Sequence, residues 1–242
     1  MRWKFILGLL TTCAVLMSMS YTMLIPFLPM YLIQDLGVVK ADVDMWSGAI
    51  FAITFLVSGI MAPIWGALAD KQSRKLMALR AGFCLAITYF LGGLVTNPWE
   101  LLGVRFIQGL SAGLWPALLA IISVESPKLK LGFCLGVMQG GMTAGGVLGP
   151  LFGGLLADQF GMRMAFFIAA AALFLITLAL LFFVKEEPRK PDPNAKPVKI
   201  WDFSLCKIPA VKRMLICAGV VQLTILMQQP IMPLYVAELQ GS

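Results

Sequence analysis

The stretch from Gly141 to Gly154, GMTAGGVLGPLFGG, decides the fold of this chain, because its glycines recur at every fourth position. They share one face of a helix, and they are Gly141, Gly145, Gly149 and Gly153. In a soluble helix each would cost about 1 kcal/mol relative to alanine, whereas in a membrane small residues at this spacing let two helices pack closely. The stretch therefore predicts a tight pair of membrane helices, with a kink at Pro150. A face that serves packing alone is the alternative interpretation.

The composition is typical of an integral membrane protein. Of the 242 residues, 60% are hydrophobic and only 13% are charged, which lies outside the range of soluble domains. A helix of about 20 residues crosses the hydrocarbon core. Seven apolar segments reach that length, near residues 5–33, 45–69, 76–95, 99–123, 131–157, 164–184 and 213–236. The first is too long for a removable signal peptide, so we expect an all-α membrane protein.

The basic residues predict the orientation of these spans. Nearly all of the 19 Lys and Arg residues lie at the N-terminus or in the connections after spans two, four and six. The set after span two is Lys71, Arg74, Lys75 and Arg80. Because positive charge gathers on the cytoplasmic side, we expect a cytoplasmic N-terminus. The net charge of +7 is thus explained by the orientation of the spans and by contact with membrane lipids. Nucleic acid is not an expected partner.

Several kinds of chemistry are not expected from this sequence. The chain contains no histidine and no P-loop pattern, which argues against a histidine-based triad, a histidine-ligated metal and ATP hydrolysis. The cysteines lie in or beside apolar segments without a CxxC spacing, so we interpret them as packing residues: Cys13, Cys84, Cys134, Cys206 and Cys217. We therefore expect no enzyme activity, no metal and no cofactor.

The connection between spans six and seven divides the chain. Four prolines lie close together in this charged segment, before Ile200, at positions 188, 191, 193 and 197, and predict a cytoplasmic linker. The apolar cluster around Trp201 and Phe203 indicates either a short helix in the headgroup layer or an irregular segment. We expect a six-span bundle over 1–184, the linker over 185–212, and over 213–242 the first span of an incomplete second bundle.

A repeated pattern supports this division. Pro26, Pro29 and Tyr31 in span one have the same PxxPxY spacing as Pro230, Pro233 and Tyr235 in span seven. Parallel repeats of six helices build one large class of transporters, so about five further spans would complete the second copy. Chance agreement at three positions is the alternative.

A charged turn follows span two. The sequence GALADKQSRK over residues 66–75 places Asp70 one turn after Gly66 and next to cations. A solvated cytoplasmic turn accounts for the cations. It explains less well why a glycine and a carboxylate end an otherwise apolar helix.

Arg105 lies well within span four, followed by Gln108 and Gly109. An arginine at membrane depth costs about 2.5 to 3.5 kcal/mol on insertion scales, so it should face protein or a water-filled cavity and have a partner. The alternative is an arginine that extends to the outer headgroups, since Trp99 and Glu100 begin the same helix.

These features resemble the motifs of the major facilitator superfamily, and within it those of drug:proton antiporters with twelve spans. The loop motif GxxxD[RK]xG[RK][RK] is matched by Gly66, Asp70, Lys71, Arg74 and Lys75, with Ser73 in place of the second glycine. The RxxQG motif is matched by Arg105, Gln108 and Gly109. The antiporter motif GxxxGPxxGG is matched by Gly145, Gly149, Pro150, Gly153 and Gly154. The first-helix motif of exporters is similar to Pro26, Pro29, Tyr31 and Asp35.

The resemblance implies a location in the bacterial inner membrane, a fold and a mechanism. The fold is the N-terminal six-helix bundle of this superfamily plus the first helix of the second bundle. The mechanism is alternating access, with Asp70 and its cations acting in gating and Arg105, Gln108 and Gly109 in proton coupling. Spans one to six hold no acid near the midplane, so the principal proton carrier is either Asp35 or a residue outside this chain. The glycine face would seal span five against a helix of the second half, and would be an open groove in this chain.

The expected substrates are small lipophilic compounds, and the expected driving ions are protons. Side chains that could line an adaptable cavity are Met17, Met19, Tyr21, Met23, Met138, Gln139 and Met142, although such residues are more often packing or lipid-facing. Two alternatives stay open: a sugar or metabolite exporter of the same fold, and a half-molecule that does not transport and acts only by pairing with another chain or with its missing C-terminal half.

Overall fold

The computed structural model describes residues 2–185 and 209–240 of the chain. Within them, the side chains of Arg2, Asp70, Lys71 and residues 225–240 lie outside the description. The chain divides into two units, Met1–Ala195 and Lys196–Ser242, and each is described by itself. The predicted interfacial helix around Trp201 falls outside the described residues.

The described part of the first unit is helical throughout. Its α-helices are α1 (Arg2–Leu24), α2 (Leu28–Gln34), α3 (Val43–Lys71), α4 (Arg74–Leu94), α5 (Pro98–Leu110), α6 (Leu114–Glu125), α7 (Leu131–Phe160) and α8 (Met162–Phe183). Short 3-10 turns, η1 (Lys40–Asp42) and η2 (Lys128–Lys130), precede α3 and α7. The second unit contains α9 (Pro209–Gln240), which runs without a break through Pro230 and Pro233.

Six segments of the described residues are long and apolar enough to cross a membrane, and they overlap the first six predicted spans, although the first ends at Leu24 rather than near residue 33. The all-helical membrane fold predicted from the sequence is therefore confirmed. The fourth segment is made of two helices, α5 and α6, whereas the first is α1 alone and α2 follows it after a turn.

Each interruption has a cause in the sequence. Pro26 lies in the turn between α1 and α2, and Pro29 occupies the first turn of α2, where a missing N–H is tolerated. Between α5 and α6, Gly113 has a φ of +119°, in the left-handed region where residues with a side chain are strained. Pro150 behaves differently, because α7 continues through it as one helix.

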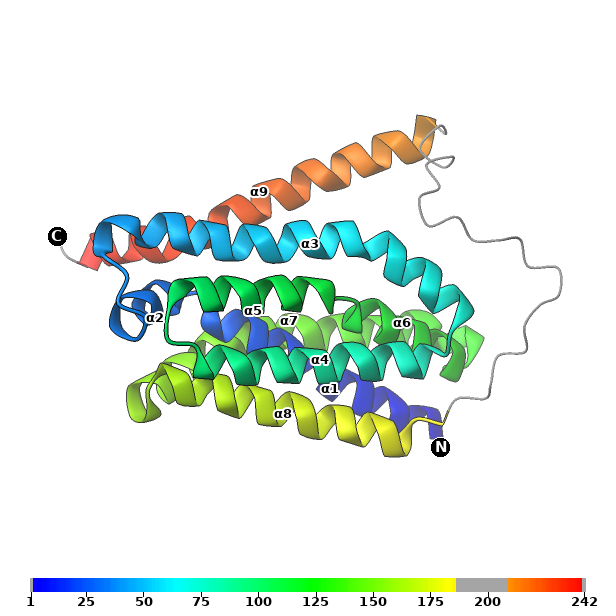
Figure 1. Cartoon of the computed structure of the whole chain (residues 1–242). Helices are drawn as coiled ribbons and strands as arrows, with labels where there is room; N and C mark the ends of the chain where they lie inside the picture. The colour runs from blue at the N-terminus through cyan, green and yellow to red at the C-terminus, as the bar shows by residue number, and fades with distance from the viewer. Residues whose placement is uncertain (1, 186–208, 241–242) are drawn as a thin grey trace. The chain divides into compact units, whose positions relative to one another are not determined.

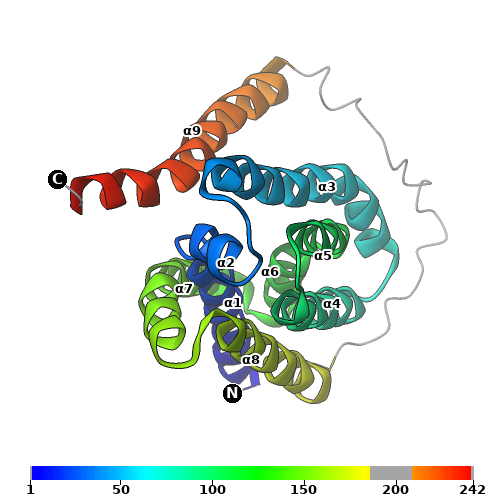
Figure 2. The same ribbon diagram turned by 60° about the vertical axis from the view of Figure 1, so that its left-hand side comes forward.

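The bundle is assembled from pairs of neighbouring helices. α1 packs on α7, α4 on α8, α3 on α5, and α4 on α6 (Figures 1 and 2). Figure 1 shows the N-terminus, the α3–α4 turn and the end of α8 at the same end of the bundle. We call this the basic end, because it carries Arg74, Lys75, Lys128 and Lys130, and the other is the opposite end.

The glycine face of α7 is covered by α1, so the predicted open groove is wrong. Gly145, Gly149 and Gly153 are buried. A Cβ atom at Gly153 would lie 2.7 Å from the Met23 carbonyl oxygen, and one at Gly145 would meet the backbone of Val15. The glycines thus bring two backbones together, as the spacing predicts, but the partner is span one of the same unit.

Candidate functional site

Arg105 is buried in α5 at membrane depth, with only 5% of its surface exposed. Its Nη1 donates a hydrogen bond of 2.9 Å to Oε1 of Gln108, one turn further along the helix. Among the described residues no carboxylate pairs with it. The prediction that Arg105 faces protein and has a partner agrees with this geometry, and the interpretation of Arg105 as a side chain in the outer headgroups does not.

Gly109 holds this part of α5 against α3. A Cβ atom there would lie 2.8 Å from both the backbone oxygen of Thr54 and Cβ of Val57. The Thr54 hydroxyl in turn lies 3.4 Å from the Arg105 carbonyl oxygen, to which it donates. The RxxQG motif therefore places a buried guanidinium, an amide and a close helix contact in one turn of α5.

A mostly apolar cavity of about 250 Å³ lies beside this motif. Its lining residues include Met17, Ser18 and Tyr21 of α1, Thr54, Phe55 and Ser58 of α3, Tyr89 of α4, Gln108 and Gly109 of α5, and Met142 of α7. The buried Tyr21 hydroxyl has no hydrogen-bond partner among the described residues. Tyr89 lies near Arg105 and Gln108, although its hydroxyl makes no well-formed hydrogen bond to either. We call this the midplane cavity.

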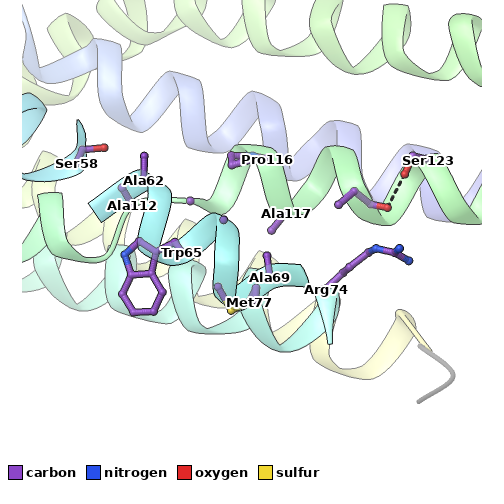
Figure 3. Close-up of a pocket in the computed structure, with 13 residues that line it drawn as sticks. Ser58, Ala62, Trp65, Ala69, Arg74, Met77, Ala112, Pro116, Ala117 and Ser123 are labelled. Atoms are coloured by element: carbon purple, nitrogen blue, oxygen red, sulfur yellow. Dashed lines mark hydrogen bonds between the residues drawn. The ribbon is translucent and has the colours of Figure 1, made fainter. Parts of the chain in front are cut away.

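A second cavity, of about 670 Å³, lies toward the basic end, between α3, α4 and α6. Small residues such as Ala62, Gly66 and Ala117 provide its space. Figure 3 shows Trp65 and Met77 on one side and Pro116 and Ala117 on the other, with Arg74 and Ser123 toward one end and Ser58 toward the other. We call it the basic-end cavity.

The two cavities meet at the interruption between α5 and α6. Four residues line both: Ser58, Ala112, Gly113 and Pro116. The same short segment thus forms a wall of the midplane cavity and of the basic-end cavity. The two cavities are therefore neighbours along the bundle, between the basic end and the centre.

The loop motif borders the basic-end cavity. Gly66 and Arg74 line it, and Lys75 donates a hydrogen bond of 2.6 Å to the Leu181 carbonyl oxygen of α8. Ser73 is the N-cap of α4, because its hydroxyl accepts a bond from the Leu76 N–H. This role explains the departure from the family glycine, since serine is a strong N-cap residue. The side chains of Asp70 and Lys71 lie outside the described part of the structure.

The first-helix motif lies at the opposite end. The fully buried Tyr31 of α2 donates a hydrogen bond of 2.9 Å to the Gly92 carbonyl oxygen of α4. Asp35 forms an ion pair of 3.2 Å with Arg163, which follows the α7–α8 turn, and Arg163 also bonds the Val95 carbonyl oxygen. The structure therefore pairs Asp35 with Arg163, and does not bring it together with Arg105.

The predicted substrate-lining residues lie in different environments, and only some of them line a cavity. Met17, Tyr21 and Met142 line the midplane cavity. Met23 and Met138 are instead core residues, and Gln139 is exposed on α7. Within the described residues, no cluster of acidic or cysteine side chains could hold a metal ion.

Sequence reasoning misplaced Arg80 and overlooked Trp65. Arg80 belongs to α4, whereas the sequence assigned it to the connection after span two. Its guanidinium lies flat over the Trp65 ring, 3.3 Å from the centroid. It also donates a hydrogen bond of 3.1 Å to the Ala112 carbonyl oxygen at the α5–α6 interruption. A useful signal was its position within the predicted span 76–95, where it is the one charged residue.

Comparison with known proteins supports a transport fold. The chain is 37% identical to the multidrug resistance protein MdtG of Yersinia enterocolitica over 99% of this chain and 58% of that protein. It is 38% identical to MdtG of Citrobacter koseri over 100% of this chain and 60% of that protein. The chain thus spans about three fifths of the length of these curated relatives. The match to these relatives indicates that the chain is a multi-pass protein of the bacterial inner membrane. The relatives themselves are transporters rather than enzymes.

Solved structures agree in fold. A bacterial homologue of the human lysosomal transporter Spinster, in an inward-facing conformation, aligns with 85% of this chain and 48% of its own, with a TM-score of 0.67 and 23% identity. The human organic anion transporter MFSD10 aligns with 74% of this chain and 47% of its own, with a TM-score of 0.62 and 21% identity. The family model of the major facilitator superfamily matches residues 10–242. With its motifs in the expected spans and a sequence match over nearly its full length, the chain belongs to the major facilitator superfamily.

Proposed function

We propose that the protein exports lipophilic small molecules in exchange for protons, by alternating access. The observation that carries this proposal is the pairing of Arg105 with Gln108 beside the midplane cavity. A buried cation at membrane depth is costly and therefore points to a functional site. Gln108 and Tyr89, which lie beside Arg105, both line the midplane cavity, and no carboxylate of the described residues pairs with Arg105. The name of the MdtG relatives supports a multidrug substrate range.

The protein is oriented with its N-terminus in the cytoplasm. The support is that Arg74, Lys75, Lys128 and Lys130 lie at the same end as the N-terminus, while Lys40 and Arg163 belong to the other end. Substrate would enter the basic-end cavity from the cytoplasm and pass to the midplane cavity. Residues 1–184 form the first half of the transporter, 185–212 the linker, and 213–242 begin the second half.

The test uses the complete protein encoded by the gene, in everted membrane vesicles with an imposed proton gradient. Accumulation of a cationic dye, ethidium, and of a neutral dye, N-phenyl-naphthylamine, is followed by fluorescence. We expect gradient-dependent uptake that a protonophore abolishes, and loss of uptake in Arg105→Gln. Lys130→Gln is the matched control, because it also removes a cation but on a surface turn, where Lys130 lies over Trp3.

Other outcomes would contradict the proposal. Uptake that is unchanged by the protonophore would exclude proton exchange. Uptake of a labelled sugar, with neither dye moved, would favour the metabolite exporter. An inactive complete protein would favour a non-transporting role.

A further inference from the structure

The α5–α6 interruption leaves two backbone carbonyl groups without helical partners. In a continuous helix the Ala112 carbonyl would accept a bond from the N–H of the residue at position 116, but that residue is Pro116 and has no N–H. In a continuous helix the Leu110 carbonyl would accept a bond from the Leu114 N–H. The left-handed turn at Gly113 ends that continuity, because Leu114 is the first residue of a new helix, α6. Backbone groups at membrane depth must find partners elsewhere.

Two side chains from other helices supply these partners. Trp65 of α3 donates from Nε1 to the Leu110 carbonyl oxygen at 2.8 Å. Arg80 of α4 donates from Nη2 to the Ala112 carbonyl oxygen at 3.1 Å. The guanidinium also stacks on the Trp65 ring, so the two donors hold each other in place. Together they fix the ends of α5 and α6 to α3 and α4.

The position of Arg80 is informative. It lies six residues after the first residue of α4, about 9 Å along the helix from the basic end. A long arginine side chain at that depth can extend to the headgroups. Here the side chain is half-buried and turned to the interruption. Its role is therefore tied to the interruption rather than to the membrane surface.

The interruption is also where the two cavities meet. Ala112, Gly113 and Pro116 line both, and Trp65 lines the basic-end cavity (Figure 3). We propose that the two cavities connect past this interruption, and that Arg80 and Trp65 are positioning residues that hold the interrupted helix apart and so keep this passage open. This inference rests on the proposed transport function and deepens it, because it assigns the control of substrate passage to a pair of residues outside the transport motifs.

The test separates positioning from simple stabilisation by using Pro116→Ala. This change restores an N–H that can bond the Ala112 carbonyl if the helix becomes continuous. Four forms of the complete protein are compared: wild type, Arg80→Gln, Pro116→Ala and the double variant. Lys130→Gln again serves as the control, since it also removes a cation that lies over a tryptophan. Thermal stability in detergent and dye uptake in everted vesicles are measured for each.

We expect Arg80→Gln to lower the maximal rate of uptake by about tenfold or more while the apparent KM changes by less than about twofold, since the passage and not the binding surface is altered. Arg80→Lys should retain more uptake, because an ammonium group can still donate to the Ala112 carbonyl, although it lacks the planar surface for stacking. The double variant should recover the thermal stability of the wild type but not its uptake. Recovery of both would overturn the proposal, because Arg80 would then only satisfy a carbonyl group.

A second measurement does not depend on the choice of dye. The thiol introduced by Ser111→Cys lies in the midplane cavity, and that introduced by Ser123→Cys lies in the basic-end cavity. Both are labelled in everted vesicles with a membrane-impermeant maleimide, and the sites are identified by peptide mass, so native cysteines can stay. We expect Arg80→Gln to slow labelling at position 111 by about tenfold and to leave position 123 unchanged. A labelling rate at position 111 that Arg80→Gln leaves unchanged would overturn the inference, even if the wild type moves neither dye.

Discussion

The contact between α1 and α7 gives a quantitative prediction for Gly149→Ala. The added Cβ atom would meet the Thr22 hydroxyl and would lie 2.7 Å from the Met19 carbonyl oxygen and 3.0 Å from the Met23 nitrogen. The last two atoms belong to the α1 backbone, so no change of rotamer relieves the contact. The helices must separate by several tenths of an ångström, and overpacking of this kind costs about 1 to 3 kcal/mol.

Gly140→Ala on the same helix is the matched control, because no atom lies within 4 Å of a Cβ atom there. Both changes gain about 1 kcal/mol of helix propensity, so that contribution cancels in the comparison. The difference between the variants is then the overpacking cost alone. At about 2 to 4 °C per kcal/mol, Gly149→Ala should unfold several degrees below Gly140→Ala.

The assay is thermal unfolding of the purified complete protein in detergent, followed by tryptophan fluorescence. Both variants are measured at the same protein and detergent concentrations. Equal melting temperatures would refute the close contact of α7 with α1. A higher melting temperature for Gly149→Ala would mean that the face packs loosely and that glycine is not needed there.

Three further changes test single contacts. Tyr31→Phe removes the donor to the buried Gly92 carbonyl and should cost about 1 to 3 kcal/mol of stability, measured by thermal unfolding. Asp35→Asn breaks a partly exposed ion pair with Arg163 and should cost less than about 1 kcal/mol; a simultaneous loss of gradient-driven dye uptake would identify Asp35 as the proton carrier, and unchanged uptake would exclude it. Ser73→Ala removes the α4 N-cap and should cost about 0.5 to 2 kcal/mol, whereas Ser73→Gly, the residue of the family motif, should cost only a few tenths; equal costs would contradict the capping role.

The helices were the most predictable part of this protein. Six of the predicted spans overlap segments of the structure, and all but the first agree within a few residues, because apolar length is a local property that the hydrocarbon core imposes. The interruption at Pro26, which ends the first span early, was not predicted, since Pro150 in α7 and Pro230 in α9 leave their helices unbroken. A proline alone does not decide whether a helix breaks, because neighbouring groups can satisfy the carbonyl group it leaves free.

The partners of these helices could not be predicted from local sequence. The glycine spacing correctly indicated a close helix contact. We expected the partner helix to belong to the second half of the transporter, but it is α1. Likewise, Arg80 was grouped with the cations of the turn, although its side chain reaches Ala112 in another span. Both facts depend on which helices are neighbours, and nothing in the spacing of one helix specifies the other.

The close contact between α1 and α7 bears directly on the midplane cavity. Met17 and Tyr21 of α1 line that cavity, and Gly145 packs on the backbone of Val15, two residues before Met17. The lateral position of this cavity wall is therefore set by how closely α7 approaches α1. Glycine at this face fixes the approach at backbone contact, whereas any larger residue would push α1 and α7 apart and so change the position of the wall that carries Tyr21 relative to the wall that carries Met142. In the proposed mechanism the antiporter motif thus acts within this half of the transporter, by setting the width of the cavity beside the buried arginine.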